Sequence, residues 1–211
     1  MDGVLVDSTE AHYAAWCGLA GEIGVTCSRD IFESTFGMHN RQIIPLWLAR
    51  ELPDEELDRL SRRKEEIYRE VAPSSITALP GVRELIDVLA RERDFALAVG
   101  SSGPRPNIEL VLDLLGAADK FAALSTGDEV RHGKPDPEVF LIAARKLGLP
   151  PRRCAVIEDA PQGVKAGIAA GAKVVAVTST KPAEELREAH LVVDALSEIG
   201  PDILRRLIES G

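Results

Sequence analysis

The chain has 211 residues, of which 45% are apolar, enough for a sizeable core in one domain or in one domain with an insertion. Lys and Arg number 25 against 34 Asp and Glu, so the formal net charge is −9, and 4% of the residues are aromatic. This composition excludes non-specific nucleic-acid binding, which needs a cationic surface and stacking platforms. No apolar run approaches the roughly 18 residues of a membrane helix, and no secretory signal is visible, so we expect no membrane partner.

The cysteines and histidines form no metal-binding pattern. The chain has three cysteines, an odd number, at Cys17, Cys27 and Cys154, and their spacing is not that of metal ligands. We therefore expect no disulfide framework and a reducing, cytoplasmic location. The histidines are scattered and make no zinc motif.

From about Thr9 to Val71 the pattern is helical throughout. Apolar side chains recur there at steps of three and four residues, most clearly between Leu57 and Val71, on a highly charged background. Asp7 followed by Glu10 predicts a capping box at the start of the first helix. No convincing strand occurs in this stretch.

From about residue 76 onward, helices and apolar strands alternate. We expect strands at 95–101, 121–125, 154–158, 173–178 and 191–193, and helices at 81–91, 107–115, 137–147, 162–170 and 199–209. Near-continuous apolar strands of this kind indicate a parallel sheet covered on both faces. The predicted fold class is therefore α/β, a Rossmann-like doubly wound parallel sheet with an inserted all-helical cap. Residues 1–8 and 76–211 form the α/β core, and residues 9–75 form the cap.

Polar residues follow several of the predicted strands, and ligands of such sheets bind beyond the carboxyl ends of the strands. Four segments carry them: MDGVLVDS at 1–8, AVGSS at 98–102, GKPDPEVF at 133–140 and VIEDAPQGVKAG at 156–167. In this order and spacing, the segments resemble the motifs of the haloacid dehalogenase superfamily, within its branch of phosphatases and β-phosphoglucomutase-like enzymes. The resemblance spans nearly the whole chain.

The resemblance implies phosphoryl transfer through an aspartyl-phosphate. The family motif has two aspartates two residues apart, which face the same side of a strand. Asp2 matches the second, the general acid and base. The nucleophilic aspartate and its central strand would precede Met1, where this sequence has nothing. We expect either a start placed several codons late, which we favour, or a true pseudo-enzyme. A chain without the central strand should be destabilised or prone to aggregate.

The acidic pair Glu158 and Asp159 matches the family's magnesium site. The resemblance makes Asp159 a direct ligand of Mg²⁺, Glu158 a direct or water-mediated ligand, and Asp2 a ligand through its backbone carbonyl. The other interpretation makes Asp159 the N-cap of the following helix.

Three further residues match the phosphate-binding part of the family site. Lys134 corresponds to the lysine that pairs with the phosphate and the nucleophile, against the alternative of a solvated surface lysine. Ser101 corresponds to the hydroxyl that binds a phosphoryl oxygen, and Ser102 extends this cradle. A simple turn is the alternative for the serine segment.

The predicted cap carries the candidate specificity residues. His12 resembles the histidine that gates the acid/base aspartate, and Lys64 resembles a cap lysine that faces the active site. Both have plain alternatives, a helix-surface histidine and a solvated charge run. The specificity loop contains His39, Asn40 and Arg41. Asn40 replaces the mutase's phosphate-binding arginine, and Arg41 is displaced from it by one position.

These matches favour a Mg²⁺-dependent phosphohydrolase acting on a small phosphorylated metabolite such as a sugar or polyol phosphate, as a monomer. A mutase must hold two phosphates in turn. Asn40 replaces one of its anchors, and the lysine that would follow the serine segment is missing, with Gly103, Pro104 and Arg105 in its place. We therefore expect a phosphatase. The alternatives are a sugar-phosphate mutase and a catalytically dead module that binds a phosphorylated ligand. Dehalogenase chemistry fits poorly because it needs neither Asp2 nor the acidic pair. A dinucleotide oxidoreductase is excluded because no G-x-G-x-x-G follows a strand.

Overall fold

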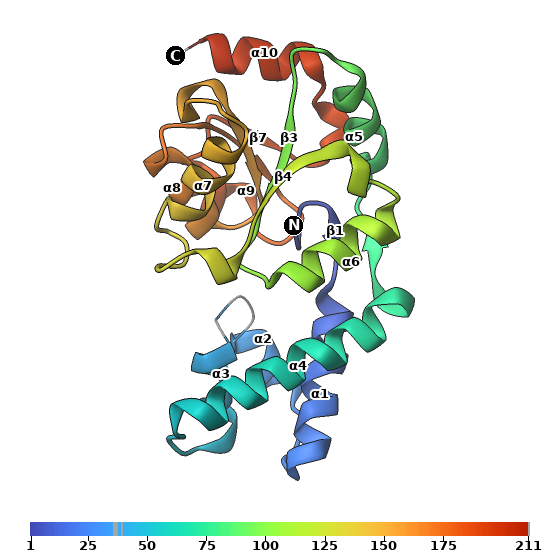
Figure 1. Ribbon diagram of the computed structural model, residues 1–211, viewed down its shortest axis with the longest axis vertical. Helices are drawn as coiled ribbons and strands as arrows, with labels where there is room; N and C mark the ends of the chain where they lie inside the picture. The colour runs from blue at the N-terminus through green and yellow to red at the C-terminus, as the bar shows by residue number, and fades with distance from the viewer. Residues whose placement is uncertain (36–37, 39, 211) are drawn as a thin grey trace. The chain divides into compact units, whose positions relative to one another are not determined.

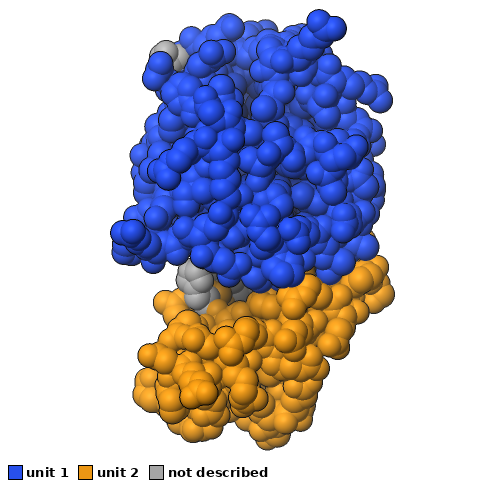
Figure 2. All heavy atoms as spheres, in the orientation of Figure 1, with its two compact units in different colours: residues 1–7, 78–211 blue, residues 8–77 orange. Residues whose placement is uncertain are grey.

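The computed structural model describes residues 1–35, 38 and 40–210. It divides into two compact units: one comprises Met1–Asp7 and Ala78–Gly211, the other Ser8–Thr77 (Figures 1 and 2). The first is called the α/β unit below and the second the helical unit. In the described part of the chain, no helix has the length and hydropathy that crossing a membrane requires.

The helical unit contains helices only. They are α1 (Thr9–Ile23), α2 (Arg29–Thr35), α3 (Asn40–Leu48) and α4 (Asp54–Ser75). Its centre is the contact between α1 and α4, where Gly18 lets the Ile67 side chain approach the α1 backbone. The buried residues of α4 recur at steps of three and four, as the sequence pattern predicts: Leu57, Leu60, Lys64, Ile67, Tyr68 and Ala72.

Two sequence-based expectations for this unit are wrong. Cys17 and Cys27 form a disulfide that ties the middle of α1 to the segment before α2, with 5.0 Å between the Cα atoms. The predicted capping box is also absent: the N-cap of α1 is Ser8, which makes no side-chain cap hydrogen bond. Asp7 instead ends the short strand β1 (Val6–Asp7), which pairs with β2 (Thr77–Ala78). A strand of two residues is too short to show an alternating apolar pattern, so the sequence predicts neither β1 nor β2.

The α/β unit is built on parallel strands. Strand β3 (Leu97–Gly100) pairs with β4 (Phe121–Ser125). Strand β5 (Ala155–Glu158) pairs with β6 (Lys173–Val177), and β6 pairs with β7 (Leu191–Val193). β6 is the most deeply buried strand, which explains its unbroken apolar sequence.

Helices follow the strands in alternation and cover them. They are α5 (Val82–Arg91), α6 (Arg105–Leu115), α7 (Glu138–Lys146), α8 (Pro161–Ala169), α9 (Ala183–Leu186) and α10 (Pro201–Glu209). α7 packs on β3 and β4, α8 packs on β5 and β6, and Figure 1 shows α5 on the opposite side of the strands. The fold is therefore the expected Rossmann-like α/β core with an inserted helical cap. The short helix α9 was not predicted.

Candidate active site

The carboxyl ends of β3 and β5 carry four of the residues that the sequence singles out, Ser101, Ser102, Glu158 and Asp159, and Lys134 reaches Glu158 from the loop after β4. Lys134 and Glu158 form an ion pair there, with side chains that are 17% and 6% exposed. The Lys134 ammonium also lies 5.0 Å from the centre of the Phe140 ring. Burial raises the pKa of Glu158, but the Lys134 ammonium and the nearby Met1 amino group outweigh it, so the pKa is lowered overall. Lys134 is therefore not a solvated surface lysine.

Asp159 lies beside this pair, at the start of the loop after β5. Its carboxylate accepts a 2.6 Å hydrogen bond from the Thr180 hydroxyl. Burial and the neighbouring Glu158 carboxylate raise the pKa of Asp159. The helix that follows has Ala160 as its N-cap, so the alternative that Asp159 caps α8 is wrong.

Two glycines make room for these carboxylates. A Cβ atom on Gly163, in the first turn of α8, would overlap the Glu158 carboxylate. A Cβ atom on Gly3 would overlap the Asp159 carboxylate, and Gly3 has a φ of +67° that other residues rarely adopt. The turn that carries Asp2 therefore lies directly against Asp159.

The serine segment, which contains Ser101 and Ser102, is connected to the same region through contacts of its own. Ser101 follows β3 and is 4% exposed, and its hydroxyl accepts a hydrogen bond of 3.1 Å from the Gly103 amide. Gly100 packs against the Phe140 ring, over which the Lys134 ammonium lies. The Ser102 carbonyl is closely approached by Gly127. The serine segment is thus both a turn, as the plain alternative holds, and a neighbour of the Lys134 loop.

The helical unit has its own buried polar cluster. Lys64, with a side chain 3% exposed, lies 2.8 Å from Nδ1 of His12 and 3.0 Å from the Glu65 carboxylate. The Asn40 amide donates a 2.7 Å hydrogen bond to the same carboxylate. An ammonium group can only donate, so Nδ1 of His12 accepts and the neutral ring carries its proton on Nε2. Lys64 is therefore not part of a solvated charge run.

The other predicted residues of the helical unit are placed differently. The Arg41 guanidinium pairs with the carboxylates of Asp54 and Asp58. His39 lies outside the described residues.

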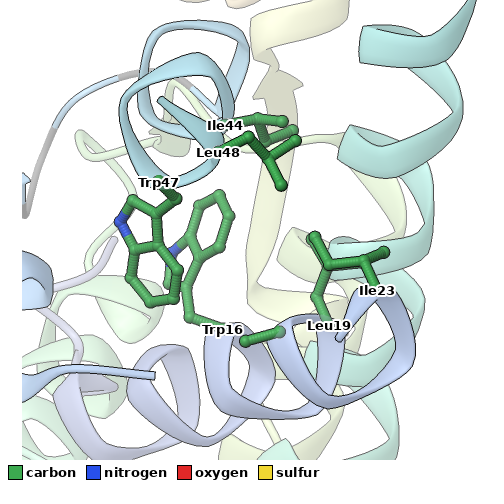
Figure 3. Close-up of a pocket in the computed structure, with 7 residues that line it drawn as sticks. Trp16, Leu19, Ile23, Ile44, Trp47 and Leu48 are labelled. Atoms are coloured by element: carbon green, nitrogen blue, oxygen red, sulfur yellow. The ribbon is translucent and has the colours of Figure 1, made fainter. Parts of the chain in front are cut away.

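The two tryptophans of the chain pack within the helical unit. The Trp16 and Trp47 rings lie 5.2 Å apart between α1 and α3. Together with aliphatic side chains of these helices they line a small apolar hollow (Figure 3).

Sequence reasoning missed Glu65, Ser179 and Thr180. Glu65 lies in a run of charged residues at 62–66, and the sequence pattern there does not distinguish a buried carboxylate from a solvated one. Ser179 and Thr180 follow β6, and the rule that polar residues after a parallel strand face the site would have found them.

The donor set at this edge fits a hard divalent cation. Among the described residues, no three His, Cys, Asp or Glu side chains gather as a metal site. Glu158 and Asp159 nevertheless place two carboxylates side by side with the Asp2–Gly3 turn against them. Burial and then the Glu158 carboxylate raise the pKa of Asp159, and a cation bound to both carboxylates would offset their repulsion. Oxygen donors of this kind suit Mg²⁺, which retains several water ligands.

Comparisons with known proteins identify the family. Residues 1–171 match the model of haloacid dehalogenase-like hydrolases. Hexitol phosphatase A of Escherichia coli (strain K12) is 33% identical over 201 residues, 94% of this chain and 90% of that protein. The chloroplastic 5-amino-6-(5-phospho-D-ribitylamino)uracil phosphatase of Arabidopsis thaliana is 31% identical over 99% of this chain, which spans 56% of that relative's length. Beta-phosphoglucomutase of Bacillus subtilis is 30% identical, with 97% and 91% covered.

Solved structures agree with the sequence matches. A family IA hydrolase from Entamoeba histolytica superposes with a TM-score of 0.88 at 26% identity, covering 99% of this chain and 96% of that one. CbbY from Rhodobacter sphaeroides, in complex with xylulose-(1,5)bisphosphate, gives 0.83 at 25% identity, with 95% and 93% covered. The chain therefore belongs to the haloacid dehalogenase-like hydrolase family. Its activity class is that of a phosphatase, a phosphoric monoester hydrolase.

Proposed function

We propose that the protein hydrolyses the phosphate monoester of a small sugar or polyol, with Mg²⁺ as cofactor. The observation that carries the proposal is the buried cluster of Lys134, Glu158 and Asp159 against the Asp2–Gly3 turn. The lysine, and a cation held by the two carboxylates, would together neutralise the charge of a dianionic phosphate at one edge of the sheet. Relatives named for hexitol phosphates support the substrate class.

The roles of the residues follow from their chemistry. An aspartate oxygen forms a bond to phosphorus while the bond from phosphorus to the ester oxygen breaks, and Asp2 gives its proton to the departing oxygen. Water then attacks the phosphoryl group, Asp2 takes a proton from it, and the aspartate leaves as carboxylate. The products are the alcohol and inorganic phosphate. Lys134 and the Ser101 hydroxyl hold the phosphoryl oxygens, with Ser102 beside them.

The position of the nucleophile in this proposal is the one directly before Met1, outside the printed residues. Met1 packs against the cluster of Val99, Ile108 and Leu112, and its amino group lies near Glu158. A residue joined to the Met1 amino group would therefore lie near Glu158, the ion-pair partner of Lys134.

Glu158, Asp159 and the Asp2 carbonyl would hold the Mg²⁺ ion. Bound there, the ion would offset the negative charge of the phosphoryl oxygens. Glu158 also orients Lys134, because it is the ion-pair partner of that lysine.

Specificity is assigned to the helical unit. By resemblance, His12, Lys64, His39 and Asn40 are the residues through which the helical unit would select the substrate. Arg41 is engaged by Asp54 and Asp58. Because a mutase must bind a second phosphate and this guanidinium is already paired, we favour hydrolysis over isomerisation.

A panel of phosphorylated metabolites tests the substrate class. The protein used is an Asp-extended chain, in which an apolar strand of about five residues ending in Asp precedes Met1. We expect phosphate release from sugar or polyol phosphates that requires Mg²⁺ and is abolished by Asp159→Asn. An isomerised sugar phosphate that appears only with a bisphosphate would instead identify a mutase. Binding of these compounds without turnover would identify a phospholigand-binding module. Size-exclusion measurements with light scattering test the expected monomer.

A further inference from the structure

We propose that Thr180, in the loop after β6, is a positioning residue for Asp159, and that its hydroxyl sets the affinity of the site for a divalent cation. The inference rests on the proposed function, because it assigns Asp159 as a metal ligand. Its own basis is the set of contacts that Thr180 makes within the α/β unit.

The Thr180 hydroxyl contacts Asp159 twice. It lies 2.6 Å from the carboxylate oxygen Oδ2 and 3.0 Å from the backbone carbonyl oxygen of the same residue. A single hydroxyl that bridges a side chain and its own backbone restricts the side-chain torsions of Asp159. One carboxylate oxygen is then held in place, and the other is available for a ligand.

The same loop also holds the turn that carries Asp2. The Ser179 hydroxyl donates a hydrogen bond to the Gly3 carbonyl. The Thr180 methyl group packs where a Cβ atom of Gly3 would stand, next to the Asp159 carboxylate. Three segments therefore meet at Thr180: the loop after β5, the loop after β6, and the turn of Asp2 and Gly3.

This arrangement is a hydrogen-bonded support behind a carboxylate ligand. Partners that orient metal-binding side chains contribute to affinity without touching the metal, and their removal typically weakens binding about 10- to 100-fold. The Asp159 carboxylate is buried beside the Glu158 carboxylate, and the Thr180 hydroxyl is the group that holds one of its oxygens. The threonine hydroxyl thus keeps Asp159 in the orientation that a cation requires.

Two substitutions separate the hydroxyl from the methyl group. Thr180→Val keeps the shape and the packing on Gly3 but removes the hydrogen bonds, whereas Thr180→Ser keeps the hydroxyl. Thr178→Val is the matched control, because Thr178 lies two residues earlier and its hydroxyl bonds to Asp194 at 2.8 Å. The probe is Mn²⁺, whose dissociation constant for the full chain is measured from the electron paramagnetic resonance signal of the free ion.

We expect Thr180→Val to weaken Mn²⁺ binding about 10-fold. Thr180→Ser and Thr178→Val should bind as the unmodified chain does, and far-ultraviolet circular dichroism should show all variants folded. Equal affinity in Thr180→Val, or equal weakening in Thr180→Ser or Thr178→Val, would overturn the positioning role and leave the proposed function intact. No Mn²⁺ binding by the unmodified chain would overturn the positioning role, since Asp159 would then not hold a cation in this chain, whereas the proposed function fails only if the Asp-extended chain releases no phosphate.

Discussion

Single residues decide whether the acidic pair can form. Gly163 is the clearest case, because a side chain at this position would occupy the space of the Glu158 carboxylate. Glu158 is in turn the partner of Lys134. One methyl group in α8 would therefore disturb both the predicted metal ligand and the predicted phosphate-binding lysine.

We expect Gly163→Ala in the Asp-extended chain to lower phosphatase activity about 100-fold, the cost of misplacing reactive groups by about 1 Å. The control is Gly21→Ala, since Gly21 also lies inside a helix and a Cβ atom there meets nothing. Gly21→Ala should leave activity unchanged and raise the free energy of unfolding by about 0.5–1 kcal/mol. Full activity in Gly163→Ala would show that the Glu158 position does not matter.

At the scale of elements, the sequence predicts strands and helices where the apolar pattern extends over enough residues to be distinct. The limits of β4 and β7 agree with the sequence pattern residue for residue, since turn residues bound both runs. The pairing of Cys17 with Cys27 was not predictable, because it depends on how α1 lies against the segment before α2. The same is true of Glu65, whose burial depends on the packing of α4 against α1.

The buried carboxylate of Glu65 makes the stability of the helical unit pH-dependent. Burial raises the pKa of Glu65, but the Lys64 ammonium and the Asn40 amide outweigh it and lower the pKa below 4.5. The stabilisation is therefore complete at neutral pH, declines as the pH falls toward 4.5 and is lost as it falls through the lower pKa of the folded state.

We expect Glu65→Gln to lower the free energy of unfolding by about 3 kcal/mol at pH 7, because the buried Lys64 ammonium loses the charge of the neighbouring Glu65 carboxylate. Urea unfolding at several pH values measures the difference from the unmodified protein. That difference should shrink as the medium is acidified below pH 4.5. A difference independent of pH would mean that the Glu65 charge does not stabilise the unit.

The disulfide constrains the same unit by a different means. Closing a loop between residues 10 apart lowers the entropy of the unfolded chain, which corresponds to about 2.5 kcal/mol of stability. A thiol reagent added to the denatured, unreduced protein should titrate only Cys154, and reduction should lower the unfolding free energy by that amount. Three reactive thiols before reduction would contradict the pairing.

At the scale of the whole molecule, the sequence was most informative where one topological rule applied. Parallel strands end at one edge of a sheet, so the sequence alone assigns Ser101, Lys134 and Glu158 to a common region. Contacts through backbone turns, such as Gly3 against Asp159, could not be derived because they depend on φ angles and loop packing. The cytoplasmic location, the monomeric state and the substrate remain predictions.

The central claim is that an aspartate placed directly before Met1 faces Lys134 and Asp159 and attacks phosphorus. The measurement is phosphate release from a hexitol phosphate, in the presence of Mg²⁺, by the Asp-extended chain and by the same extension ending in Asn. The account predicts turnover with the aspartate and a loss of at least about 1,000-fold with the asparagine, as when a nucleophile is removed. Equal rates in the two proteins, or no turnover in either, would contradict it.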